Sequence, residues 1–163
     1  MATTSFGSEE TDRHGWNSLE GYLSIHDNRL NNHSFLDPSK PHTIGITYHQ
    51  INDEESVMAI QGHVFCLGNV VLEVEKYLQM MERENGQLFV RGFSYRYHAF
   101  VPGEHSLVRY DNSHGEDVYH RHAFEPVTGQ ETEITDLTRN EFPTFSEILD
   151  ELEEIYLESS SNG

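Results

Sequence analysis

A period-two alternation of apolar and polar residues between positions 43 and 124 limits the fold more than any other feature of the sequence. Six segments there alternate or are rich in β-branched and aromatic residues: 43–51, 56–67, 70–81, 87–101, 106–111 and 117–124. Such segments are typical of β-strands, although the second half of 70–81 is also compatible with a helix. Turn-forming pairs such as Gly68-Asn69 and Pro102-Gly103 separate them, and short connections favour antiparallel neighbours. The sequence therefore predicts an antiparallel, meander-like β-sheet of five to six strands.

Helical periodicity flanks this region on both sides. Towards the C-terminus, apolar residues recur at helical spacing over residues 145–157: Phe145, Ile148, Leu149, Leu152, Ile155 and Tyr156. Thr144 precedes them and Glu147 follows three residues later, which is the pattern of an N-terminal capping box. Residues 16–25 predict a short N-terminal helix. Residues 26–41 are dense in Asn, Asp, Ser and Pro and predict a loop.

The length of 163 residues suits one domain with a substantial core. We expect a single α+β domain over residues 16–157, with the C-terminal amphipathic helix and the short N-terminal helix packed on one face of the sheet. The polar N-terminus, residues 1–15, is expected to be mobile, and residues 158–163 are expected to form a disordered tail.

Acidic residues greatly outnumber basic ones. The chain has 28 Asp and Glu against 10 Lys and Arg, a formal net charge of −18. This charge repels nucleic-acid phosphates at long range, and it suits either a high-salt cytoplasm or a basic partner. No apolar run reaches the roughly 18 residues of a membrane-spanning helix, and the N-terminus lacks a secretory signal pattern. The single cysteine, Cys66, lies in an apolar segment and cannot form a disulfide within the chain. Together these features predict a cytoplasmic protein.

The segment RYDNSHGEDVYHRHAF at residues 109–124 concentrates ionisable side chains. Residues two apart in a strand face the same way, so Arg109 and Asp111 share a face of one predicted strand. By the same rule His120 and His122 share a face of the next strand, and His114 lies in the connection. If the two strands are neighbours, we expect all five side chains to lie within reach of one another.

The preceding strand contributes a further set of polar and aromatic residues. Tyr95 and Tyr97 share one of its faces, and Arg96 and His98 share the other. If this strand is also a neighbour in the meander, Tyr or His side chains from residues 95–98 line the edge of the site.

Three interpretations fit the cluster. Histidines that titrate near neutral pH can transfer protons, Arg109 can hold a phosphate, and Asp111 can fix a histidine tautomer, which together suit metal-independent RNA cleavage through the 2′-hydroxyl. Alternatively, the histidines His114, His120 and His122 with Asp111 can bind zinc or another transition metal. In the third interpretation these side chains simply form the solvated side of the strands. The sequence has no nucleotide-binding glycine motif or nucleophile elbow, and we expect no cofactor.

The stretches GFSYRYHAF, LVRYDNSHG and YHRHAF, taken together, resemble the TumE-type toxin family of prokaryotic type II toxin–antitoxin systems. The resemblance covers roughly residues 43–157, and the Arg-Tyr-Asp-Asn-x-His portion is its most specific part. It implies a small toxin that acts on RNA and is paired with a helix-turn-helix antitoxin. The positions that match the family pattern are Tyr95, Tyr97, Arg109, Asp111, Asn112, His114, His120 and His122.

The resulting hypothesis is a toxin-like ribonuclease. His120 or His122 would be the general base or acid, and Arg109 would hold the phosphate. Asp111 and Asn112 would orient the site, and Tyr95 or Tyr97 would stack a base of the RNA. The alternative is a non-catalytic metal-binding or interaction module with a histidine cluster.

Overall fold

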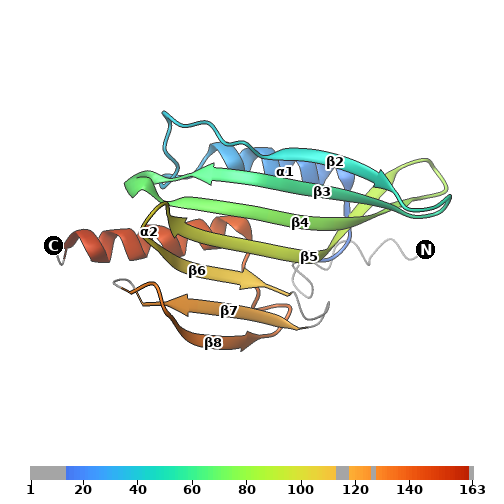
Figure 1. Ribbon diagram of the computed structural model, residues 1–163. Helices are drawn as coiled ribbons and strands as arrows, with labels where there is room; N and C mark the ends of the chain where they lie inside the picture. The colour runs from blue at the N-terminus through green and yellow to red at the C-terminus, as the bar shows by residue number, and fades with distance from the viewer. Residues whose placement is uncertain (1–13, 113–117, 126–127, 162–163) are drawn as a thin grey trace.

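The computed structural model describes residues 14–112, 118–125 and 128–161. Figure 1 shows the elements of this part in chain order: β1 (Asn17–Ser18), α1 (Leu19–Asn31), β2 (Gly45–Gln50), β3 (Ser56–Phe65), the 3-10 turn η2 (Leu67–Asn69), β4 (Val71–Glu82), β5 (Leu88–Val101), β6 (His105–Asp111), β7 (Tyr119–Phe124), β8 (Glu131–Leu137) and α2 (Phe145–Ser161).

The strands form one antiparallel sheet. Seven of them follow in the meander order β2-β3-β4-β5-β6-β7-β8, and β1 pairs with β5 outside this path. The predicted α+β class and antiparallel meander are therefore confirmed, and the predicted count of five to six strands is wrong. The structure adds β1 and also β8, a segment that lies outside the strands predicted from the sequence. In β8 acidic residues are interspersed with Thr and Ile, and the strand pairs along β7.

The C-terminal helix α2 begins where the sequence predicts. The backbone N–H of Thr144 donates to Oε1 of Glu147 at 2.9 Å, and the N–H of Glu147 donates to Oγ1 of Thr144 at 3.4 Å. This reciprocal pair is the predicted capping box. The helix continues to Ser161, so residues 158–161, which were expected in the disordered tail, are helical.

The N-terminal helix α1 is longer than predicted and takes in the start of the expected loop. The Ser18 hydroxyl caps its first turn by accepting from the N–H of Gly21 at 3.1 Å. In its last turn the Asn31 side chain donates to the carbonyl of Asp27 at 2.8 Å. The Asn-rich composition that predicts a loop here instead supplies bonds between residues four apart, which are neighbours on a helix.

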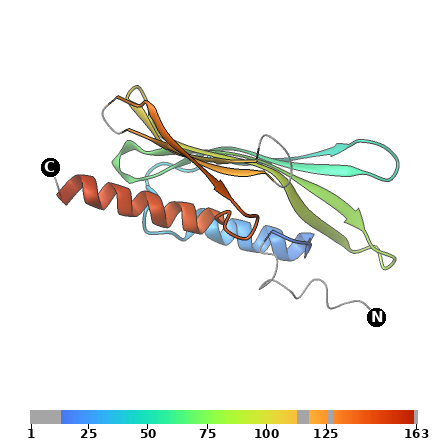
Figure 2. The same cartoon turned by 90° about the horizontal axis from the view of Figure 1, so that it is seen from below.

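Both helices lie on the same face of the sheet, as predicted, and Figure 2 shows both of them beneath it. The larger part of the core packs under α2 and includes Leu72, Leu149 and Leu152, each at most 1% exposed. A smaller cluster of Met58, Ile60, Leu78 and Val90 is completed by residues of α1. Within the described ranges, no helix is long and apolar enough to cross a membrane.

Candidate active site on the open face of the sheet

Two contacts with α2 identify which side chains of β6 and β7 face the helices. The hydroxyl of Tyr110 donates to Oε2 of Glu151 at 2.7 Å, and Nη2 of Arg121 donates to Oε1 of the same carboxylate at 3.2 Å. Side chains alternate along a strand. The neighbours of Tyr110 and Arg121 therefore project from the opposite face, which no helix of the described chain covers (Figure 2). We call it the open face.

The pairing of β6 with β7 brings four of the predicted site residues together on this face. Arg109 stands opposite His122, and Asp111 stands opposite His120. Directly opposed residues of antiparallel strands have Cβ atoms only about 4.5–5.5 Å apart. The expectation that these four side chains lie close together is confirmed. His114, the fifth predicted residue, lies outside the described residues.

Asp111 links the guanidinium to the imidazole. Its Oδ2 accepts from Nε of Arg109 at 3.0 Å and lies 3.4 Å from Nε2 of His122. Nη2 of Arg109 lies 3.3 Å from Nδ1 and 3.4 Å from Nε2 of His122, so the guanidinium sits beside the ring. The side chains of Asp111 and His122 are only 5% and 8% exposed, whereas that of Arg109 is 29% exposed. The guanidinium is thus the member of this group that solvent reaches.

Two acidic residues of β8 complete the cluster. Nδ1 of His122 lies 2.6 Å from Oε1 of Glu131, and Nδ1 of His120 lies 2.9 Å from Oδ1 of Asp136. The two imidazole centroids are 6.0 Å apart. Neither acid is among the site residues predicted from the sequence, because residues 131–137 lie outside the predicted strands. The β-branched residues Thr132, Ile134 and Thr135 between them are the signal that could have found the strand.

The charges of the cluster balance in one protonation state. Arg109, Asp111, His122 and Glu131 carry two positive and two negative charges when the imidazole is protonated. Both of its nitrogens then donate, one towards each carboxylate. The arrangement thus places the His122 imidazole between two carboxylates and beside a partly exposed guanidinium, and His120 stands next to it with its own carboxylate.

The polar row continues across β5 and β4. His98 stands opposite Arg109, Arg96 stands opposite Asp111, and Glu73 stands opposite His98. Nη1 of Arg96 donates to Glu73 at 2.5 Å, and Nε2 of His98 lies 2.8 Å from the Ser106 hydroxyl. Burial, with a contribution from Arg96, lowers the pKa of His98. The residues that line the edge of the site are therefore Arg96 and His98.

Tyr95 and Tyr97 do not face the site. They lie on the helix side of β5, 6% and 3% exposed, and both rings pack against Phe142. The Tyr95 hydroxyl lies over Gly92, where a Cβ would clash with it. Burial raises the pKa of Tyr97. The prediction that Tyr95 or Tyr97 stacks a base is wrong, because both rings form part of the core.

Asn112 has a backbone role. Its side-chain oxygen accepts from the N–H of Tyr95 at 2.8 Å, and its amide nitrogen donates to the carbonyl of Phe93 at 2.8 Å. The residue is 4% exposed. It ties the end of β6 to an irregular stretch of β5 and so orients the site through the backbone.

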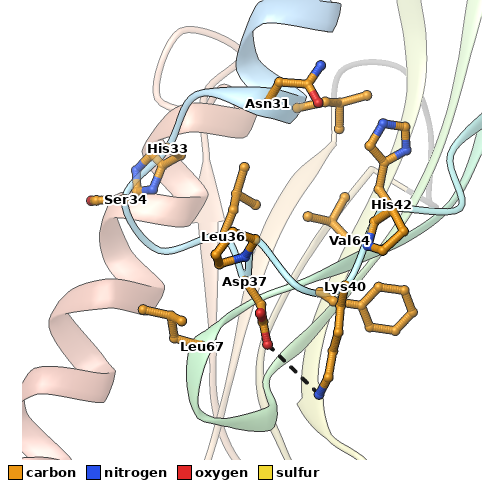
Figure 3. A pocket seen from close by; sticks show the side chains of 13 residues that line it. Asn31, His33, Ser34, Leu36, Asp37, Lys40, His42, Val64 and Leu67 are labelled. Atoms are coloured by element: carbon orange, nitrogen blue, oxygen red, sulfur yellow. Dashed lines mark ion pairs between the residues drawn. The ribbon is translucent and has the colours of Figure 1, made fainter.

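Among the described residues, no group of three or more His, Cys, Asp and Glu is arranged to hold a metal ion. The pocket in Figure 3 lies elsewhere, between residues 30–42 and β3, and contains the pair between Lys40 and Asp37 at 4.0 Å.

Comparison with protein-family models, curated proteins and solved structures gives no match to this chain.

Proposed function

We propose that this chain is a toxin-like protein that acts on RNA as a metal-independent ribonuclease, with its active site on the open face of the sheet. One observation carries the proposal. A partly exposed guanidinium and two imidazoles meet on adjacent strands, and each imidazole is contacted by a carboxylate. Phosphodiester cleavage through the 2′-hydroxyl needs these groups: a cation for the phosphate and two groups that exchange protons.

The residues have distinct roles in the proposed reaction. His120 takes the proton from the 2′-hydroxyl, whose oxygen attacks the adjacent phosphorus. The bond from phosphorus to the 5′-oxygen breaks, and His122 gives its proton to that leaving oxygen. Arg109 neutralises the charge that develops on the phosphate oxygens. The products are a 2′,3′-cyclic phosphate and a free 5′-hydroxyl.

The carboxylates act through the imidazoles. Glu131 and Asp111 face the two nitrogens of His122 and fix the orientation of the ring that acts as the general acid. Oδ1 of Asp136 lies 2.9 Å from Nδ1 of His120, so this carboxylate stands beside the second imidazole. These three residues are positioning residues, because none of them contacts the phosphate in this scheme.

The negative net charge of the chain affects its binding of both RNA and a protein partner. With a net charge of −18, the protein repels RNA until the strand reaches the local arginines and histidines of the open face. The resemblance to TumE-type toxins adds a helix-turn-helix antitoxin as the expected protein partner, and a basic antitoxin surface would match the acidity of this chain.

A non-catalytic interaction module is the second candidate, and the internal ion pairing favours it. Arg109, Asp111, His122 and Glu131 satisfy one another across β6, β7 and β8. Such a network can simply join three strands at the end of the meander. In that case its variants change stability and leave RNA untouched.

Expression in growing cells tests the proposal. The wild-type chain without an antitoxin should arrest growth and degrade RNA, and the variants Arg109→Ala and His120→Ala should relieve both effects. His105→Ala is the matched control, since it lies on β6 outside the cluster, and it should remain toxic. If the wild-type chain is harmless, or if His105→Ala relieves toxicity equally, the ribonuclease assignment fails.

A further inference from the structure

We propose that two copies of the chain associate edge to edge through β2, so that their sheets join into one continuous sheet. In the described part of the chain, β2 is the last strand at one end of the sheet order, and all six of its residues are exposed. Figure 1 shows β2 along one edge and β8 along the other. An edge strand presents unpaired backbone N–H and C=O groups that can pair with another strand.

The two edges of the sheet differ in charge. β8 carries Glu131, Glu133 and Asp136, and charged residues of this kind protect an edge strand from pairing. Residues 43–51 contain no Asp, Glu, Lys or Arg and no proline, although the whole chain has a net charge of −18. The edge at β2 is thus the one that lacks protection, and a second uncharged strand meets no like charge there.

The backbone of β2 shows which groups face outward. The N–H of Thr43 donates to His63 and the N–H of Ile51 donates to Glu55, both at 2.9 Å. Both donors are odd-numbered residues that point towards β3 and the turn leading into it. Because backbone bonding alternates along an antiparallel strand, the N–H and C=O groups of Ile46 and Tyr48 point away from β3.

The side chains of the same two residues extend an apolar surface past the edge. Ile46 and Tyr48 are 36% and 57% exposed, and they stand opposite Ile60 and Met58, which are fully buried under α1. They therefore lie on the helix side of the sheet, at the border of the smaller core cluster. A strand added to β2 would cover them.

A second copy of this chain fits that edge in one antiparallel arrangement. A two-fold axis at Thr47 places Ile46 of each copy opposite Tyr48 of the other, and outward-facing backbone groups then meet each other. The same arrangement carries the acidic turn at residues 53–55 towards Lys40 of the other copy. Lys40 is the one lysine or arginine between residues 30 and 75, and its side chain is 49% exposed. The strand that pairs with β2 is therefore β2 of a second copy, whose Lys40 lies near the acidic turn at residues 53–55.

Sedimentation velocity over a range of protein concentrations tests the association. The wild-type chain should form a dimer whose fraction rises with concentration and with added NaCl, since salt screens the repulsion between two chains of charge −18. The double variant Ile46→Lys/Tyr48→Lys should stay monomeric and retain the wild-type circular dichroism spectrum. Ile134→Lys, a matched change on the other edge strand, should still dimerise.

Disulfide trapping tests the arrangement itself. Thr47 would face Thr47 of the second copy as a pair without backbone bonds, with Cα atoms about 4.5 Å apart, and this distance permits a disulfide. Thr47→Cys should therefore cross-link on mild oxidation. His49→Cys should not, because Gly45 stands opposite it, and the native Cys66 is buried. A monomer at all concentrations, a dimer that survives the double lysine variant, or equal cross-linking at position 49 would overturn the proposal.

Discussion

Nε2 of His122 lies 3.4 Å from Oδ2 of Asp111, and both side chains are almost completely buried although they lie on the face of the sheet that no described helix covers. A buried carboxylate is costly unless it is paired. Asp111 meets this requirement with both the imidazole and the guanidinium of Arg109. The stability of this corner of the sheet and its proposed chemistry therefore depend on the same contacts.

Replacement of Arg109 by methionine should lower the free energy of unfolding by roughly 1–3 kcal/mol. Breaking a fully buried ion pair costs about 3–5 kcal/mol, and the partial exposure of Arg109 reduces that cost. Chemical denaturation at pH 7 measures it. The double variant Arg109→Met/Asp111→Leu should recover part of the loss, because no carboxylate is then left unpaired. A double variant as unstable as the sum of the single changes would argue against the coupling.

Lys76 predicts a pH dependence of stability. Burial lowers its pKa from 10.5 to about 7 in the folded chain. Between these values the unfolded chain binds more protons, so the free energy of unfolding should rise as the pH rises from 7 to 9. Above pH 9 the Cys66 thiol opposes this gain, because burial raises its pKa to about 12 and only the unfolded thiol ionises. The two contributions cancel up to about pH 10.5, where Lys76 of the unfolded chain loses its proton, and stability should fall only beyond that pH.

The variant Lys76→Met isolates this contribution. It should stabilise the chain at pH 7 by at least about 1 kcal/mol and flatten the slope between pH 7 and 9. Lys40→Met changes the other lysine, which is half exposed, and should leave the slope intact. Thermal or urea unfolding at several pH values decides between these outcomes. An unchanged slope in Lys76→Met would show that another group is responsible.

The packing of α2 is tested by a charge in its buried face. Leu152 is 1% exposed, and Leu152→Asp both opens a cavity and buries a carboxylate. We expect a loss of about 3 kcal/mol or more, seen as a large drop in thermal midpoint or as failure to fold. Leu157→Asp, at a position that is 59% exposed, should change stability by less than about 0.5 kcal/mol.

The sequence predicted those parts of the fold that depend on local periodicity. The alternation over 43–124 gave the meander, and the apolar spacing with Thr144 and Glu147 gave the start of α2. Side-chain parity along two neighbouring strands was enough to place Arg109 and Asp111 beside His120 and His122. Short connections made these strands neighbours, so no long-range information was needed.

Which face of each strand packs against the helices could not be predicted, because the alternation of side chains shows only which residues share a face. Tyr95 and Tyr97 were known to share a face, yet only the pairing of β5 with β6 shows that Arg96 and His98 are the residues on the side of the site. Glu131 and Asp136 were not predicted, because β8 is acidic and exposed and its sequence has only a weak preference for a strand. Its pairing with β7 stabilises it as a strand all the same.

Salt should affect RNA cleavage in a direction opposite to that of a basic ribonuclease. Raising the ionic strength from 0.1 M to 1 M shortens the Debye length from about 10 Å to about 3 Å. For a chain of charge −18 this removes long-range repulsion of the RNA, and the initial rate should rise. A basic nuclease would lose phosphate contacts over the same range. A steep fall in rate with salt would contradict this electrostatic account.

The most direct test of the central claim uses purified protein and a short RNA in excess EDTA. The wild-type chain should cleave it to products with 2′,3′-cyclic phosphate and 5′-hydroxyl ends, and a 2′-deoxy substitution at the cleaved position should block the reaction. His122→Asn, which keeps a polar group in the site, should reduce the rate about a hundredfold or more with its fold intact. Intact RNA with the wild-type chain, or an equal rate with His122→Asn, would contradict the account.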